Sequence, residues 1–319
     1  MRPLPEELGP RFSVQQAKAA GVSEGRLRRK DVDKPFHGVR VVSDAGFPAA
    51  LATDRCGRAL GPAEQAHLAR ALAYAPRMSE GEFFSHVTAA VILGIPLPHA
   101  VVARSLLHVS VLRPRRLPRS AGVRGHEAKP SLVTARRDDR TGLMVASPAS
   151  VWASIGRQLS DPYDLVAAGD AVVRTWRVDS PLATLAELES AVVAGRRVGV
   201  VAARLALPRV RTDSASRPET WLRLTLVDHG LPEPDRNHEV CENGVYLGCV
   251  DLAYPALKIA IEYEGEHHLL DPEQWSRDIA RYEALRAGGW IVVQITKSEL
   301  FGTPALAVQR VREAIRRRG

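Results

Sequence analysis

Three carboxylates within residues 248–268 could together hold a metal ion. The stretch reads GCVDLAYPALKIAIEYEGEHH, so Asp251, Glu262 and Glu264 stand among apolar and small residues. Like charges this close repel one another, and they are best tolerated when a cation or a strong base lies among the oxygens. Hard divalent cations prefer such oxygen ligands. We therefore expect a metal site here, and the alternative is a solvated acidic face on a half-exposed strand pair.

Alternation of side chains predicts that these carboxylates share one face of two antiparallel strands. A two-residue turn at 255–256 would pair Asp251 with Ala260, on the same face as Glu262 and Glu264. A slip of one residue would place Asp251 among the isoleucines and bury its charge without a partner. The sequence thus predicts an acidic face on one side of the pair and an apolar, buried face on the other.

The residues around the carboxylates resemble the PD-(D/E)XK nuclease superfamily. Asp251 is followed by EYEG at 262–265 and a following His, and then by the residues Trp275, Asp278, Arg281, Leu285, Gly289 and Trp290. The pattern, over residues 213–319, is most similar to domains related to very-short-patch-repair (Vsr) endonucleases. The superfamily's E-x-K lysine would fall at Glu264, where the Vsr-like branch commonly has an acid followed by Gly.

This resemblance implies a restriction-endonuclease-like α/β sheet domain and a Mg²⁺- or Mn²⁺-dependent endodeoxyribonuclease. Asp251 and Glu262 would hold the metal ion, and Glu264 would orient a water bound to it. His267 or His268 would serve as general base or would protonate the leaving oxygen.

The rest of this domain is expected to be two helices and a further strand. A helix over residues 216–228 has Glu219 in its first turn, where the superfamily often presents a Glu, although an acid there also suits the helix dipole. A helix from residue 271 to 287 precedes an apolar strand at 290–296. This strand must lie parallel to the strand at 258–264.

Residues 1–45 are interpreted as a winged helix-turn-helix. Ser13 and Ser23 are expected to cap two helices, the second over residues 24–30, and residues 36–42 alternate as a wing would. The second helix carries the expected DNA-binding residues Arg26, Arg28, Arg29 and Lys30. The segment resembles the N-terminal winged helix of AbiE-type (type IV toxin–antitoxin) antitoxins, which implies a toxin or defence-system partner. The alternative is a small structural cap.

Residues 60–205 are expected to form a mostly helical, antitoxin-like middle domain. A strand at 108–112 leads into a basic loop, and its residues Arg113, Arg115 and Arg116 are candidates for phosphate contact. Ser85 and His86 resemble a nucleophile and its base, but neighbouring residues on a helix face apart and no acid would orient the His. We therefore interpret His86 as structural.

Composition is that of a globular protein with a polyanionic partner. The 319 residues, 45% of them hydrophobic, suffice for two or three domains, and the net charge of +8 favours DNA. No run of about 18 apolar residues and no apolar signal region occur, so we expect a cytoplasmic protein without a membrane partner. Cys56, Cys241 and Cys249 have no CxxC spacing, which predicts neither a zinc site nor a disulfide.

The sequence thus predicts an α/β (multi-domain α+β) protein with three domains, over residues 1–45, 60–205 and 213–319. One hypothesis is a metal-dependent DNA endonuclease, favoured by intact Asp251, Glu262, Gly265 and His267. The other is an antitoxin-like DNA-binding transcriptional regulator whose nuclease-like domain is catalytically inactive, favoured by the missing lysine.

Overall fold

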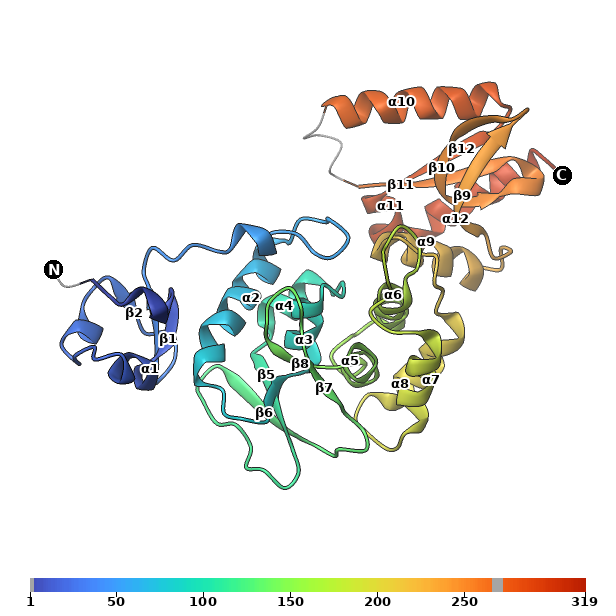
Figure 1. The fold of residues 1–319 in the computed structure, drawn as a ribbon. Coiled ribbons are helices and arrows are strands. Elements are labelled where there is room, and N and C mark those ends of the chain that lie inside the picture. Colours follow the sequence, from blue (N-terminus) through green and yellow to red (C-terminus); the bar gives the residue numbers. More distant parts are fainter. Residues whose placement is uncertain (1–2, 266–271) are drawn as a thin grey trace. The chain divides into compact units, whose positions relative to one another are not determined.

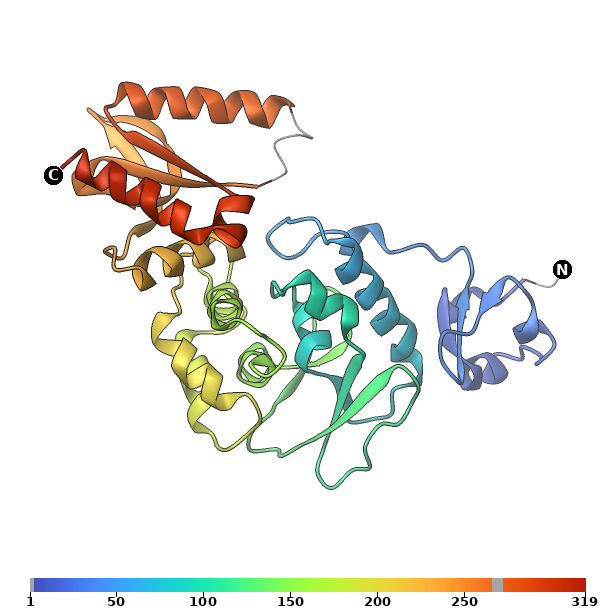
Figure 2. The ribbon, with the colours of Figure 1, turned by 180° about the vertical axis from the view of Figure 1, so that it is seen from behind.

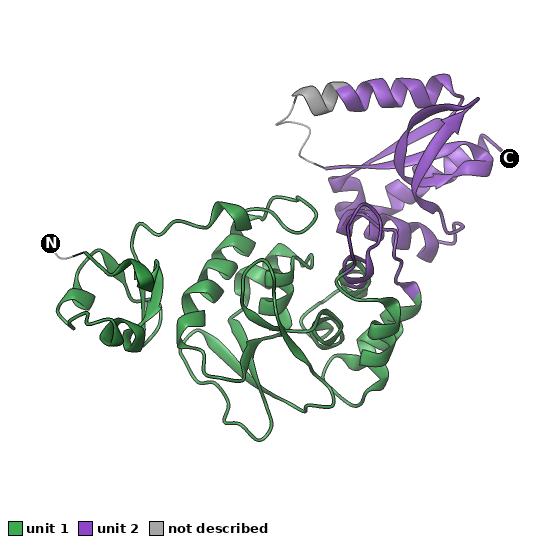
Figure 3. Cartoon of the chain, viewed as in Figure 1, with its two compact units in different colours: residues 1–168, 182–208 green, residues 169–181, 209–319 purple. Residues whose placement is uncertain are grey.

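The computed structural model describes residues 3–265 and 272–319, and in this part the chain is mixed α/β with three sheets (Figure 1). The chain divides into two compact units (Figure 3). The first comprises Met1–Ala168 and Leu182–Pro208, and the second comprises Gly169–Pro181 and Arg209–Gly319. None of the described helices is long and apolar enough to cross a membrane. The predicted α/β class is confirmed at this level.

The N-terminal segment combines a small sheet with one helix. The strands β1 (Arg11–Ser13), β2 (Val32–Asp33) and β3 (Val39–Val42) lie in the order β1-β3-β2, and α1 (Val14–Ala19) follows β1. Ser13 caps α1 as predicted, because its Oγ accepts the Gln16 N–H at 3.1 Å while the Gln16 side chain accepts the Ser13 N–H at 2.7 Å.

The prediction of a second helix over residues 24–30 is wrong, because only a single short turn forms there. Only a 3-10 turn, Arg26–Arg28, forms between residues 24 and 30. Gly25 weakens a helix that is already too short to be stable alone. The Arg26 guanidinium instead pairs with both oxygens of Asp31, at 3.0 and 2.7 Å, just before β2. The antiparallel pair of β2 and β3 supplies a hairpin, which begins earlier than the alternation at 36–42 indicates.

A five-stranded mixed sheet lies in the first unit, within the region at 60–205 that was predicted to be mostly helical. Its strands, in the order β6-β5-β4-β8-β7, are β4 (Glu82–Phe84), β5 (Leu107–Leu112), β6 (Val123–Ala128), β7 (Ala135–Arg137) and β8 (Met144–Ala146). Only β5 was predicted. The others are three to six residues long, and β6 and β7 carry polar side chains that hide the strand pattern.

Helices cover this sheet and complete the unit. They are α2 (Pro62–Tyr74), α3 (His86–Leu93), α4 (His99–Arg104), α5 (Pro148–Ile155), α7 (Leu185–Val193) and α8 (Val200–Ala206), and α6 (Pro162–Val173) runs from this unit into the second at Gly169. The central one is α3, whose residues 87–93 are all buried. It packs against β5, β8, α2 and α5, as a helix that is apolar all round must. The core therefore fixes where α3 begins, at His86.

The second unit is built on a four-stranded sheet in the order β12-β11-β10-β9. The strands are β9 (Asp235–Glu242), β10 (Val245–Tyr254), β11 (Ile259–Glu264) and β12 (Ile291–Thr296). β10 is antiparallel to both β9 and β11, whereas β11 and β12 are parallel. The predicted parallel pairing of the last two strands is therefore confirmed.

Helices cover both faces of this sheet (Figures 1 and 2). One face carries α9 (Arg217–Asp228) and α12 (Pro304–Arg316), with α11 (Lys297–Gly302) between β12 and α12, and the other face carries α10 (Pro272–Ala287). Leu222, Ile261 and Val311 belong to the apolar core under α9 and α12. Ala260 and Leu285 belong to the core under α10. The acidic face of the strand pair is the one that α10 covers.

The register of β10 and β11 differs from the predicted one by two residues. The structure pairs Leu252 with Ile261 and Tyr254 with Ile259, because a 3-10 turn at Pro255–Leu257 and a left-handed Lys258 replace the two-residue turn. A shift of two keeps Leu252 beside Ile259 and Ile261, whereas Val250 packs in the core under α10 with Ala260. The same register, continued one residue past the pair of Leu252 and Ile261, sets Asp251 across from Glu262 rather than Ala260.

Candidate functional site

Four carboxylates of the second unit, which we call the carboxylate cluster, come from three elements. Asp251 lies on β10, Glu262 and Glu264 lie on β11, and Glu219 lies in the first turn of α9. Glu219 and Glu262 are buried, with 7% and 4% of their surface exposed, and the other two are half-buried. The predicted site residues Asp251, Glu262, Glu264 and Glu219 thus share one region, in which burial should make their charges costly.

Neutral donors fix two of these carboxylates. The Tyr263 N–H donates to Asp251 Oδ2 at 2.8 Å, across the strand pair. The Ala215 N–H and Asn237 Nδ2 donate to Glu219 Oε2 at 3.0 and 3.2 Å. Such bonds orient the side chains but leave their full negative charge without a counter-ion.

Arg281 of α10 supplies a positive charge to the cluster. Its Nη1 donates to Glu262 Oε1 at 2.5 Å and to the Cys249 carbonyl oxygen at 3.0 Å, and its Nη2 donates to Asp278 Oδ1 at 3.2 Å. Asp278 and Arg281, three residues apart on α10, thus form an ion pair, and the contact of Arg281 with Glu262 was not predicted. Gly248 makes room for this side chain, since a Cβ there would lie 2.8 Å from Arg281 Cγ and Cδ.

Glu264 has polar partners from two elements. Tyr282 Oη of α10 and Gln294 Nε2 of β12 both donate to Glu264 Oε1, at 2.7 and 2.8 Å. The parallel register that pairs Glu262 with Gln294 and Glu264 with Thr296 brings the Gln294 side chain there. This carboxylate is therefore held in one orientation at the end of β11.

Burial raises the pKa values of the cluster. It is the main cause that raises the pKa of Glu219 to about 8, and the Asp251 charge adds to it. It also raises the pKa of Asp251 to about 6, because that carboxylate lies among protein atoms although part of the residue is exposed. The pKa of Glu262 lies well above its usual value, since burial and the Asp251 charge outweigh Arg281. One guanidinium does not neutralise this cluster.

In the metal-free protein, these shifts should make the second unit less stable as the pH rises. A carboxyl group whose pKa is raised on folding favours the folded state below its unfolded pKa of about 4, and this contribution is lost as the pH rises through the folded pKa. The folded values, about 6 for Asp251 and about 8 for Glu219, set the window. Urea denaturation in chelator at pH 5, 7 and 9 should show that the free energy of unfolding of Asp251→Asn increases relative to that of wild type as the pH rises. A constant difference would contradict the assigned shifts.

Other predicted site residues belong to the first unit or lie outside the described residues. His267 lies outside the described residues. Arg28 and Arg29 are exposed, and Arg28 pairs with Glu24 at 3.3 Å. Arg26 is largely enclosed by its pairing with Asp31, which makes it the least accessible of the predicted DNA-binding residues.

The predicted basic loop after β5 is only partly available to a phosphate. Arg113 pairs with Glu127, and Arg115 donates to the Glu80 carbonyl oxygen. Arg116 is exposed, as is Lys30 of the N-terminal segment. An exposed cation is the kind of residue that contacts a nucleic-acid backbone.

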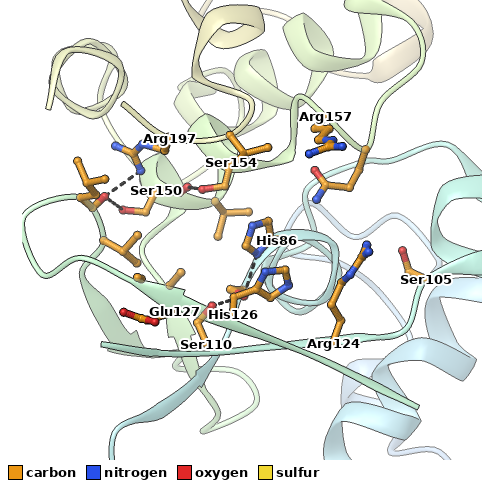
Figure 4. A pocket seen from close by; sticks show the side chains of 18 of the residues that line it. His86, Ser105, Ser110, Arg124, His126, Glu127, Ser150, Ser154, Arg157 and Arg197 are labelled. Atoms are coloured by element: carbon orange, nitrogen blue, oxygen red, sulfur yellow. Dashed lines mark hydrogen bonds between the residues drawn. The ribbon is translucent and has the colours of Figure 1, made fainter. Parts of the chain in front are cut away.

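A second candidate site, the histidine cluster, lies in the first unit (Figure 4). His86 begins α3, His108 lies on β5, and His126 lies on β6. Because the parallel strands pair Ser110 with His126, His108 and His126 project from the same face of the sheet. The ring of His126 lies 4.1 Å from that of His86 and 5.0 Å from that of His108. Potential ligand nitrogens of all three lie within 4.8 Å of one another.

Ser85 and His86 do not face apart, as was assumed when His86 was interpreted as structural. His86 Nδ1 lies 3.0 Å from Ser85 Oγ instead of facing away from it. Ser85 is extended, and His86 has a φ of +47°, a conformation that costs about 1 kcal/mol or more and is found preferentially at functional sites. Ser110 Oγ in turn donates to Ser85 Oγ at 2.7 Å. The two serines therefore orient the His86 ring.

The three rings are neutral near pH 7, and two of them, His86 and His126, line a pocket. Burial is the main cause that lowers the pKa of His86 and of His108 to about 3 each, and it also lowers the pKa of His126. The pocket measures about 850 Å³, and its wall includes His86, His126 and several basic side chains. Figure 4 shows the rings of His86 and His126 side by side, with Arg124 near them. Neutral imidazoles are the form that binds transition metals.

Among the described side chains, one group of three or more His, Cys, Asp or Glu residues brings its ligand atoms within 4.8 Å of one another, and it is the histidine cluster. The carboxylates of the second unit, with Arg281 bound to Glu262, are more widely spaced as a set. The two clusters also differ in donor type, oxygen in one and nitrogen in the other. They would suit different metals.

Comparison with known proteins gives two relatives. They are "Uncharacterized protein MT2308" of Mycobacterium tuberculosis strain CDC 1551 / Oshkosh and "Uncharacterized protein Rv2248" of strain H37Rv. Each is 33% identical over 180 residues, which cover 56% of this chain and 64% of the relative. The chain therefore spans less than two thirds of the length of these relatives. No protein-family profile and no solved structure matches the chain.

Proposed function

We propose that the second unit is a metal-dependent DNA endonuclease that hydrolyses a phosphodiester bond at the carboxylate cluster. The observation that carries this proposal is the gathering of carboxylates on β10 and β11, where Asp251 accepts the Tyr263 N–H and its charge raises the pKa of Glu262. Their raised pKa values show that the protein alone stabilises these charges poorly. An all-oxygen donor set of this kind fits Mg²⁺ or Mn²⁺.

Each residue of the cluster would have a distinct role in hydrolysis. Asp251 and Glu262 would hold the ion, which when bound lowers the pKa of a water and stabilises the charge of the reacting phosphate. Glu264, oriented by Tyr282 and Gln294, would position a nucleophilic water. Glu219 lies in the same region as a carboxyl that is largely protonated near pH 7, and a proton-transfer role for His267 remains part of the proposal.

One observation favours a second function, an antitoxin-like DNA-binding regulator with a catalytically inactive nuclease-like domain. Arg281 lies 2.5 Å from Glu262 and so partly replaces the cation that an active site would require. The absence of the E-x-K lysine at Glu264 points the same way. In this case the carboxylate cluster would be a remnant, and the AbiE-type resemblance of residues 1–45 would supply DNA binding and a toxin or defence-system partner.

The two functions are separated by cleavage of supercoiled plasmid DNA. The nuclease should convert it to nicked or linear form with Mg²⁺ or Mn²⁺ and not in chelator. A regulator should bind the same DNA and leave it intact with every metal. Binding without cleavage under all these conditions would overturn the endonuclease proposal.

Binding of DNA should depend on the exposed cations of the N-terminal segment. Reversing Arg28, Arg29 and Lys30 to Glu should weaken binding to every sequence and reduce the salt dependence by about one ion per lost phosphate contact. Arg26 is left unchanged because its pairing with Asp31 maintains the fold. Fluorescence anisotropy with two unrelated duplexes at several salt concentrations measures both effects. Unchanged affinity would make residues 1–45 a structural cap.

A further inference from the structure

Three histidines and a mainly basic pocket meet in the first unit, at a place that the proposed nuclease chemistry does not use. We propose that His86, His108 and His126 bind a divalent transition-metal ion of the zinc class, with an open coordination position that takes an oxyanion from the adjacent pocket. Imidazole nitrogens suit zinc, copper, nickel and iron, whereas Mg²⁺ requires oxygen. This site is therefore independent of the carboxylate cluster in both place and chemistry.

Two of the three histidines already lie near the spacing of metal ligands. His108 Nδ1 and His126 Nε2 lie 2.9 Å apart, so the two neutral rings share one proton. Tetrahedral zinc with Zn–N bonds of about 2.0–2.1 Å separates its nitrogen ligands by about 3.3 Å. These two rings need to part by a few tenths of an ångström and to turn their nitrogens toward the ion. The His86 nitrogen, which lies within 4.8 Å of the other two, needs to move closer.

Further contacts hold the rings in place, as partners of metal ligands commonly do. Ser110 Oγ, Ser85 Oγ and His86 Nδ1 form a chain of hydrogen bonds with steps of 2.7 and 3.0 Å. Thr88 Oγ1 accepts the His108 N–H at 2.8 Å and so fixes β5 against α3. The left-handed backbone of His86 turns its ring toward the other two rather than along the helix. A simple buried core would not require this conformation.

The pocket next to the rings determines what the open position would take. Its wall includes the basic residues Arg124, Lys129 and Arg157, for which no ion-pair partner occurs among the described residues. Glu127, the carboxylate in the wall, is paired with Arg113. Three neutral imidazoles leave the full charge of a divalent ion in place, and the arginines add to it. An anionic oxygen ligand, such as that of a phosphate group, fits this surrounding.

The first test is zinc binding by the full-length protein after treatment with chelator. In excess Mg²⁺, which occupies oxygen-donor sites, wild type should bind one zinc ion per chain. His126→Gln and His86→Gln should each weaken this binding by about 100-fold or more, because loss of a ligand costs at least as much as loss of its supporting partner. His99→Gln, an exposed histidine of the same unit, and Asp251→Asn should bind zinc as wild type does.

The half-exposed His126 provides the variant least at risk of unfolding, and circular dichroism confirms that each variant is folded. Absence of zinc binding in wild type, or equal binding in the folded His126→Gln protein, would show that the rings are only a stacked structural cluster. If Asp251→Asn loses plasmid cleavage but still binds zinc, zinc binding at the histidine cluster does not depend on the carboxylate cluster.

The open position is tested with Co²⁺ in place of zinc and inorganic phosphate as the probe. Phosphate should shift the visible spectrum of the Co²⁺ protein, and Arg124→Gln should raise the phosphate concentration required without changing the amount of Co²⁺ bound. A spectrum that phosphate leaves unchanged would overturn the open position.

Discussion

Asp251→Asn should lower metal-dependent plasmid cleavage by about a thousandfold or more. The substitution removes one negative charge from the cluster. It retains an oxygen that can accept the hydrogen bond from the Tyr263 N–H, which is 2.8 Å long in wild type. A catalytic metal ion contributes several kcal/mol to the transition state, and each 1.36 kcal/mol is tenfold in rate. Cleavage is measured as nicked product against time, at saturating Mg²⁺ or Mn²⁺.

The matched control is Asp235→Asn, the same change on β9 at a side chain that is 62% exposed. It should cleave as wild type does. Equal cleavage by wild type and Asp251→Asn would place the reaction elsewhere, and loss in both variants would indicate a general effect on the sheet.

The same variant should separate metal binding from metal-free stability. If the carboxylates hold a cation, a hundredfold excess over its Kd should stabilise wild type by about 2.7 kcal/mol. Asp251→Asn should lose this gain and be at least as stable as wild type in chelator, because it lacks the repulsion. Wild type melting identically with Mg²⁺, Mn²⁺ and chelator would count heavily against the nuclease.

The sheet of the second unit could be predicted because its signals are local. The alternation of apolar and acidic residues in β11 predicts which side chains share a face of the sheet. The helix between β11 and β12 is long enough for a crossover and predicts that these two strands are parallel. The turn between β10 and β11 could not be predicted, since a left-handed Lys258 is a conformation that nothing in its side chain requires. The error of two residues left most side chains, though not Val250, on their predicted faces, which is why the carboxylates were still placed together.

The histidine cluster could not be predicted because it depends on pairing between distant segments. His126 lies on β6, whose sequence VRGHEA has no strand pattern and which forms only because β5 offers an edge. His86 was judged by helical geometry, yet its φ of +47° departs from it. The contact of Arg281 with Glu262 was missed for a related reason, since it joins α10 to β11 across the sheet face.

Arg223→Met should destabilise the second unit by about 3–5 kcal/mol, the usual result of removing one partner from a buried ion pair. Arg223 and Asp170 are each 1% exposed, and their side chains lie 3.4 Å apart. Asp170 also accepts the Thr220 hydroxyl at 2.7 Å. These contacts fix the first turns of α9, and therefore the position of Glu219. The variant leaves the Asp170 charge buried without its guanidinium.

The matched control is Arg211→Met. Arg211 and Arg223 both bind Glu233, but the Arg211 side chain is 30% exposed, so its loss should cost less than about 1 kcal/mol. Hydrogen exchange of α9 and β10 amides in the full-length chain, at one pH, reports the stability of this unit alone. The double variant Asp170→Leu/Arg223→Met should recover much of the loss, because it removes both charges together. Equal effects of Arg223→Met and Arg211→Met would show that burial does not set the strength of this pair, and that α9 is held by its apolar face instead.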